Sequence, residues 1–82
     1  MRLAVQLFAT LKDCAHTHRL VVELPDETAT VGALLARLAW DTLTLAPSLQ
    51  TVIVAVNHEF AFADQPLQPG DDIAIFPPVS GG

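Results

Sequence analysis

The sequence predicts an α+β domain in which a mixed sheet carries one main helix across one face. Three observations predict this fold class. Apolar residues alternate with a period of two near both ends of the chain, over residues 3–8 and 72–76. An apolar stripe with helical spacing lies between them, over residues 31–38. The 82 residues, 51% of them hydrophobic, suffice for one domain with one modest core.

Two strands are expected to open the fold as a hairpin. Residues 3–8 alternate in polarity, and residues 19–24 repeat the pattern until Pro25 ends the second strand. A short helical turn over residues 9–15 is expected between them. Because this connection is short, antiparallel pairing is favoured.

The main helix is expected to begin near residue 30. Either Thr28 or Thr30 is a candidate N-cap, because a threonine hydroxyl accepts a free N–H of the first turn. Trp40 is expected to be a partly buried plug at the helix end, and residues 41–50 are expected to form a loop. The apolar stripe has the spacing i, i+3, i+4, i+7 and consists of Val31, Leu34, Leu35 and Leu38.

The second half of the chain predicts three strands. Residues 51–57 form the clearest one, residues 60–63 a short edge strand after a turn at Asn57-His58, and residues 72–76 the last. Residues 64–71 are expected to form two turns; Pro69-Gly70 suits the centre of a type II turn. With the last strand returning beside the first, this order describes a β-grasp, or ubiquitin-like, fold.

Composition argues against two classes of partner. The net charge is −5 with only four basic residues, whereas a nucleic-acid binder needs clustered Lys and Arg. No apolar run approaches the ~18–20 residues that span a bilayer, and the first residues lack the features of a signal peptide. The expected compartment is the cytoplasm, with no nucleic-acid or membrane partner.

The polar residues predict no catalytic, metal or cofactor site in the body of the domain. Cys14 is the single cysteine, so it forms no internal disulfide and is expected to act as a small apolar residue. Asp71-Asp72 is expected in a solvated loop rather than as a carboxylate dyad. The three histidines are expected at exposed or capping positions: His16, His18 and His58.

One sheet face is predicted to be apolar although no helix covers it. If the aliphatic residues of the first and last strands face the helix, then Phe8 and Phe76 face away from it. We expect a protein-binding face, since contiguous exposed apolar area usually marks an interface. The alternative is that strand-end twist or the tail covers both rings. Other residues in the same phase are Ala4, Val21, Ile53, Ala55 and Ala74.

The final residues suggest a domain of residues 1–78 followed by a flexible tail, residues 79–82. Pro77 and Pro78 lack an N–H and stop the strand, and Gly81-Gly82 remove every side chain. Such a tail suits entry into another protein's narrow active site; an inert terminus is the alternative.

The sequence resembles the small subunits of molybdopterin synthase, the MoaD-like sulfur carriers. The resemblance covers nearly the whole chain. It rests on these segments: Leu7-Phe8-Ala9, Leu11-Lys12-Asp13, Ala29-Thr30-Val31, Leu34-Leu35, Val54-Ala55-Val56-Asn57, Pro66-Leu67, Gly70-Asp71, Asp72 to Phe76 and, most specifically, Pro77-Pro78-Val79-Ser80-Gly81-Gly82.

The resemblance implies a reaction at Gly82. An ATP-dependent enzyme similar to the ubiquitin-activating enzyme adenylates Gly82, sulfur replaces oxygen to give a thiocarboxylate, and that sulfur passes to cyclic pyranopterin monophosphate to build the dithiolene of molybdopterin. The chain is then a sulfur-donating, non-catalytic subunit without a cofactor, and the catalytic residues belong to the large subunit, with which it forms a heterotetramer. A cysteine desulfurase or rhodanese is the implied sulfur donor.

The resemblance also implies which residues meet the partner. The tail residues Val79, Ser80 and Gly81 insert into the large subunit together with Gly82. The implied partner-binding residues are Phe8, Phe76, Pro77 and Pro78.

Three alternatives stay open on the sequence alone. A thiazole-pathway sulfur carrier shares the fold and the Gly-Gly ending, although such carriers tend to be shorter and to lack Pro-Pro-Val. A ubiquitin-like modifier joined through Gly82 to lysines is the second. A plain interaction module with an inert tail is the third.

Overall fold

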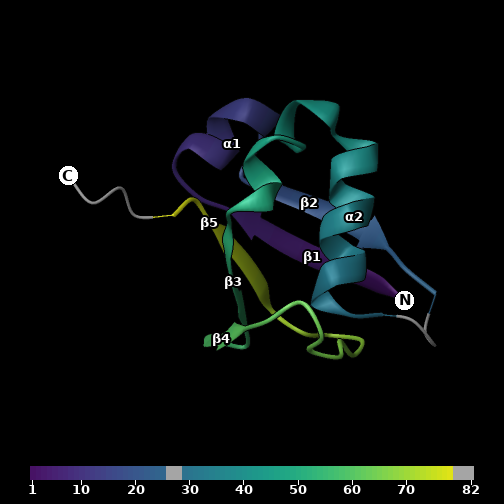
Figure 1. The fold of residues 1–82 in the computed structure, drawn as a ribbon. Helices are drawn as coiled ribbons and strands as arrows, with labels where there is room; N and C mark the ends of the chain where they lie inside the picture. The colour runs from purple at the N-terminus through teal and green to yellow at the C-terminus, as the bar shows by residue number, and fades with distance from the viewer. Residues whose placement is uncertain (26–28, 79–82) are drawn as a thin grey trace.

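A computed structural model of the chain describes residues 1–25 and 29–78. Five strands form one mixed sheet in the order β2-β1-β5-β3-β4, and the helices lie on one of its faces (Figure 1). The strands are β1 (Arg2–Leu7), β2 (Arg19–Glu23), β3 (Ile53–Val56), β4 (Glu59–Ala61) and β5 (Ile73–Phe76). The helices are α1 (Thr10–Ala15) and α2 (Val31–Asp41), followed by 3₁₀ turns at Leu43–Leu45 and Ser48–Gln50. The predicted α+β, β-grasp class is confirmed.

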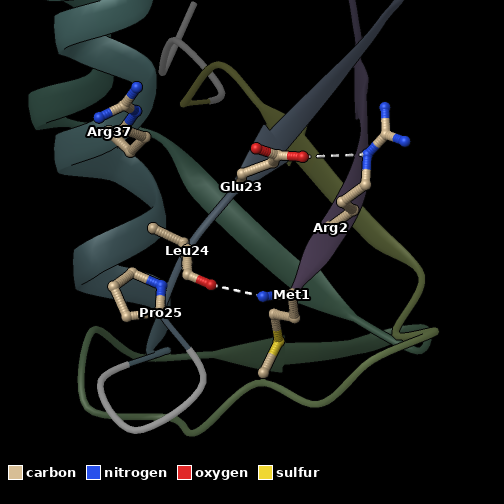
Figure 2. A pocket seen from close by; sticks show the side chains of 6 residues that line it. All are labelled: Met1, Arg2, Glu23, Leu24, Pro25 and Arg37. Atoms are coloured by element: carbon tan, nitrogen blue, oxygen red, sulfur yellow. Dashed lines mark hydrogen bonds and ion pairs between the residues drawn. The ribbon is translucent and has the colours of Figure 1, made fainter.

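The first and last strands lie side by side in the sheet, so strands from both halves of the chain are hydrogen-bonded together. β1 and β2 form the expected antiparallel hairpin, with Ala4 opposite Val21. Met1 and Leu24 extend it, because the Met1 amino group donates to Leu24 O (2.5 Å) and Leu24 N–H donates to Met1 O (2.9 Å) (Figure 2). β5 then lies parallel to β1 and antiparallel to β3, so the last strand returns beside the first as predicted.

The N-terminus of α2 is anchored by a side chain and by a distant loop. Thr30 is the N-cap, and its Oγ1 accepts the Ala33 N–H at 3.1 Å. Thr28, the other candidate, lies outside the described residues. Two further free N–H groups of the first turn, those of Val31 and Gly32, donate to Gln65 O (3.0 Å) and Ala63 O (2.9 Å).

This anchoring explains why β4 is shorter than expected. The sequence predicts an edge strand over residues 60–63, whereas the strand is Glu59–Ala61. The backbone beyond Ala61 turns away from the sheet to satisfy α2, which leaves Phe62 outside the strand and 82% exposed.

Two of the three predicted turns lie where they are expected; the third, expected over residues 64–67, lies at residues 62–65, where Gln65 N–H donates to Phe62 O at 3.0 Å. Asn57 and His58 have positive φ (52° and 70°), which suits a two-residue hairpin between β3 and β4. Gly70 has φ 87°, and Asp71 N–H donates to Gln68 O at 3.1 Å, as a type II turn requires.

The core lies between the sheet and the helices. The period of two places alternate strand residues inward, and α2 meets them with Val31, Leu34 and Leu38, each at most 1% exposed. The largest fully buried strand residues are Leu3, Val5, Leu7, Val22, Ile73 and Ile75.

Two expectations for residues 40–50 are wrong. Trp40 is 76% exposed rather than a partly buried plug, because it follows the buried Leu38 by two positions, about 200° around the helix. The expected loop instead contains two 3₁₀ turns that bury Leu45 (0% exposed) and Leu49 (6% exposed). These leucines extend the core beyond the end of α2.

In the part of the chain that the structure describes, no helix has the length and apolar character needed to cross a membrane.

Candidate partner-binding site

Two aromatic rings stack on the sheet face opposite the helices. Phe8 follows β1, and its N–H donates to Ile75 O at 3.3 Å, which fixes it beside β5. Phe76 ends β5, and the Phe8 and Phe76 ring centroids lie 4.6 Å apart with 17° between the planes. Phe8 is 39% exposed and Phe76 is half-buried. The predicted juxtaposition of these two residues on the uncovered face is therefore confirmed.

Small and aliphatic residues make the floor of this face. Ile53 pairs with Phe76 across β3 and β5, and Ala55 pairs with Ala74 two residues further along the same strands. Ala55 is only 9% exposed, and it lines the same hollow as the larger Phe8 and Phe76. The floor is thus shallow and lets aromatic side chains stand above it.

A third aromatic residue, Phe60, belongs to the same face. Its Cα lies opposite Ala55 in the β3–β4 pair, so its side chain points to the same side as Ala55. It is 82% exposed. The sequence predicts Phe60 in an edge strand, but strand phase alone does not assign it to the uncovered face. The register of the Asn57-His58 hairpin was the signal for this assignment, because a two-residue turn fixes which residues lie opposite.

These three rings border two adjoining pockets. The pocket nearer the tail has a volume of about 370 Å³ and an almost wholly apolar lining; we call it the tail-side pocket. The other measures about 290 Å³ and reaches Asp72; we call it the Asp72 pocket. Residues that line the tail-side pocket are Phe8, Ala9, Ile53, Phe60, Phe76 and Pro77.

The described chain ends at the edge of this site. Pro77 is half-buried and lines the tail-side pocket, and Pro78 is exposed beyond it. The predicted tail residues Val79, Ser80, Gly81 and Gly82 lie outside the described residues. The structure therefore brings together Phe8, Phe76 and Pro77 but does not describe the predicted reacting end.

The turns below the site are held by a network of amide and carboxylate groups. Asn57 Nδ2 donates to Asp71 Oδ1 (3.0 Å), Gln68 N–H donates to Asp71 Oδ2 (2.8 Å), and Asp72 N–H donates to Asn57 Oδ1 (2.9 Å). Asp71 thus braces two turns, which goes beyond the solvated loop that was predicted. Asp72 is exposed, and its Oδ2 lies 3.6 Å from His58 Nε2.

The remaining polar candidates are dispersed. His16 is the C-cap of α1, with φ 59°, and His18 and His58 are exposed, as predicted. Cys14 is half-buried against the core. Within residues 1–25 and 29–78, no group of three or more His, Cys, Asp or Glu residues is placed to hold a metal ion.

A separate pocket of about 510 Å³ lies at the start of β1 and the end of β2 (Figure 2). Its charged side chains already have partners: Arg2 Nε lies 3.3 Å from Glu23 Oε1, and Arg37 Nε lies 3.1 Å from Asp41 Oδ2. Arg2 and Glu23 are about three-quarters exposed (75% and 73%), so their pairing is weak. None of the residues that line this pocket belongs to β5.

A mixed five-stranded sheet crossed by one main helix, with an apolar uncovered face, defines a ubiquitin-like β-grasp protein. Residues 5–82 match the ThiS family, and the chain belongs to that family. The predicted resemblance to the small subunits of molybdopterin synthase is confirmed by curated relatives of that name. The molybdopterin synthase sulfur carrier subunit of Dictyostelium discoideum is 32% identical over 95% of this chain and 93% of the relative. That of Escherichia coli (strain K12) is 34% identical over 95% of this chain and 96% of the relative.

Solved structures share the fold. SAMP1 from Haloferax volcanii superposes with a TM-score of 0.87 at 30% identity, covering 100% of both chains. A second structure, of the H. volcanii small archaeal modifier protein 1, has a TM-score of 0.84 at 27% identity and covers 95% of this chain and 98% of that one. A chain in the complex of subunits 1 and 2 of the molybdopterin-converting factor from Helicobacter pylori has a TM-score of 0.69 at 23% identity, with 100% of both chains covered, and shows the fold alone.

Proposed function

We propose that this protein is the sulfur carrier subunit of a molybdopterin synthase. The observation that carries the proposal is similarity over 95% of the chain to proteins of that name. The family match also extends to residue 82, so the matched region includes the Gly-Gly segment.

The reaction begins at the carboxylate of Gly82. A carboxylate is a poor electrophile until one oxygen becomes part of a good leaving group. Attack of this oxygen on the α-phosphate of ATP releases pyrophosphate and forms an acyl-adenylate. A persulfide on the sulfur donor then attacks the acyl carbon, and AMP leaves. A thiol attacks the donor-side sulfur of the resulting acyl disulfide, which releases the thiocarboxylate and leaves a disulfide on the donor. Glycine suits this chemistry because it leaves the acyl carbon unhindered and permits close backbone approach.

The thiocarboxylate sulfur then attacks cyclic pyranopterin monophosphate in the large subunit. Water hydrolyses the resulting thioester, so the sulfur stays on the pterin and Gly82 regains its carboxylate. The soft sulfur is carried on the main chain, so the reaction requires no thiol from Cys14. Residues 79–82 act as the inserted tail, and residues 1–78 act as the domain that delivers it. An activating enzyme and a sulfur donor complete the set of partners.

The uncovered sheet face is the proposed docking surface for the large subunit. The Phe8–Phe76 stack lies at the base of the tail, so docking there fixes where the tail starts. Exposed aromatic rings over a shallow apolar floor are typical of interface anchors. A chain of the same fold occurs in the H. pylori complex of subunits 1 and 2.

Intact-mass analysis tests this function. The purified chain is incubated with the activating enzyme, ATP and a sulfur source, and the expected mass shift corresponds to one oxygen-for-sulfur exchange. A matched chain lacking Gly82 should show no shift. Absence of the shift in the complete chain, or its persistence without Gly82, contradicts the proposal.

A second candidate is a protein modifier joined through Gly82 to lysines of other proteins. The likeness to the small archaeal modifier protein 1 favours it specifically. Covalent ladders on a denaturing gel, dependent on Gly82, would support it. The thiazole-pathway alternative is distinguished by capture of a thiazole synthase in place of a molybdopterin synthase large subunit.

A further inference from the structure

The Asp72 pocket differs from the tail-side pocket in one chemical respect: it has a charge at its rim. Its floor consists of Ala55 and Ala74, and its walls include the rings of Phe8, Phe60 and Phe76. Its polar rim consists of Gln6, His58 and Asp72. An apolar stem with a polar tip fits such a pocket better than a purely apolar side chain does.

Asp72 is positioned to receive a cation. Its main chain is fixed by the bond from its N–H to Asn57 Oδ1 (2.9 Å), so the carboxylate projects from a held backbone. The side chain is 49% exposed, and its ionic neighbour is His58, itself 88% exposed. Arg19 shares an adjoining hollow with Asp72, but these two described residues form no ion pair. The carboxylate is therefore accessible for a partner's charge.

The aromatic walls favour the same kind of occupant. A cation within about 6 Å of a ring centroid is attracted by the ring face, and the guanidinium of arginine stacks on such faces better than an ammonium does. The chain has a net charge of −5, so a basic partner surface also complements it at longer range. The charge of the chain and the aromatic walls of the pocket therefore favour an arginine side chain as the occupant.

We propose, building on the docking role above, that the Asp72 pocket receives one arginine side chain of the large subunit. Its methylene stem lies over Ala55 and Ala74, and its guanidinium lies between Phe60 and the Asp72 carboxylate. An apolar side chain of the same partner fills the tail-side pocket. The pockets lie two residues apart along β3 and β5, so the two partner side chains are separated by about 7 Å.

Binding of the large subunit by isothermal titration calorimetry tests this pairing. Asp72→Asn keeps the shape of the side chain and removes its charge; Asp64→Asn, at an exposed turn outside the pocket, is the matched control. Loss of a charge-assisted contact at this half-exposed position should weaken binding about tenfold for Asp72→Asn, whereas Asp64→Asn should stay within about twofold of wild type. Both variants lose one negative charge, so their difference reports the local contact rather than long-range attraction.

Three further measurements sharpen the test. The Asp72→Asn complex should depend less on salt than the Asp64→Asn complex, because it has lost an ion pair. Phe60→Leu should also weaken binding, since leucine keeps apolar bulk but has no ring face. Arginines of the large subunit are also substituted by methionine, one at a time. A single one of these substitutions should weaken binding to the wild-type chain but leave binding to the Asp72→Asn chain unchanged.

The possible results distinguish failure of the arginine assignment from failure of the proposed function. If wild type binds but Asp72→Asn equals Asp64→Asn, the arginine is absent and only this inference falls. Tighter binding by Asp72→Asn would mean an acidic occupant and would also overturn it. If wild type does not bind the large subunit at all, the proposed function falls and the pocket assignment falls with it.

Discussion

Phe76→Asp is the substitution that best distinguishes an effect on binding of the large subunit from an effect on folding stability. The change removes the stack on Phe8, worth about 0.5–1.5 kcal/mol, and the partial burial of one ring, worth about 1 kcal/mol more. A domain of 82 residues has a typical free energy of unfolding of about 4–12 kcal/mol, so the variant should remain folded. Binding should suffer far more, because a central aromatic anchor contributes about 2–4 kcal/mol, or roughly 30- to 1,000-fold in Kd.

The assay is calorimetric titration of the large subunit, accompanied by denaturant unfolding of each variant. Trp40→Asp is the matched control, because Trp40 is also an aromatic residue and is 76% exposed, but it lies on α2, which covers the opposite face of the sheet (Figure 1). It should bind the large subunit nearly as wild type does. Phe76→Leu tests the same position without a buried charge and should give an intermediate Kd.

Three results would refute this reasoning. Unfolding of Phe76→Leu would place the residue in the core rather than at the interface. Wild-type affinity in a folded Phe76→Asp variant would remove the uncovered face from docking. Equal weakening by Trp40→Asp would mean that any negative charge on this chain disturbs the complex.

Two further predictions concern stability and are read from the free energy of unfolding in denaturant. Leu45→Ala should destabilise by about 2–5 kcal/mol because Leu45 is fully buried. Leu43→Ala, in the same 3₁₀ turn but 72% exposed, should change stability by less than about 0.5 kcal/mol, and equal losses would contradict the described packing. Thr30→Ala should cost about 1 kcal/mol by removing the bond to Ala33 N–H, whereas Thr30→Ser should restore most of it. A neutral Thr30→Ala change would remove Thr30 as the N-cap.

The sequence predicts the strands and the main helix well because both have a regular period. Leu3, Val5 and Leu7 alternate, and Leu34 and Leu38 repeat every four residues, so local pattern and tertiary burial agree. The Phe8–Phe76 contact follows from the same phase, once β5 is placed beside β1.

The parts that the sequence mispredicts depend on contacts between distant segments. Leu45 and Leu49 lie in short 3₁₀ turns that have no strong periodic pattern, so their burial is decided by the space beyond α2. The end of β4 is decided by the helix N-terminus, because Ala63 O accepts the Gly32 N–H. Burial of Trp40 is expected from its place at the helix end, whereas its angular position on α2 exposes it.

One part of the candidate site can be predicted from the sequence pattern, and the other part cannot. Its aromatic members can be located from strand phase, with Phe60 added by hairpin register. The role of Gly82 rests on resemblance and family membership, because chemistry at the tail leaves no pattern in the packing of the domain.

The most direct test of the central claim is a single-turnover sulfur transfer. The thiocarboxylated chain is mixed with the large subunit and cyclic pyranopterin monophosphate, without activating enzyme or ATP, and both the pterin product and the mass of the chain are measured. A dithiolene needs two sulfur atoms and each chain carries one, so two thiocarboxylates should revert to carboxylates for each molybdopterin formed. Retention of the thiocarboxylate, or its loss without molybdopterin, would contradict the account of this protein as the sulfur donor.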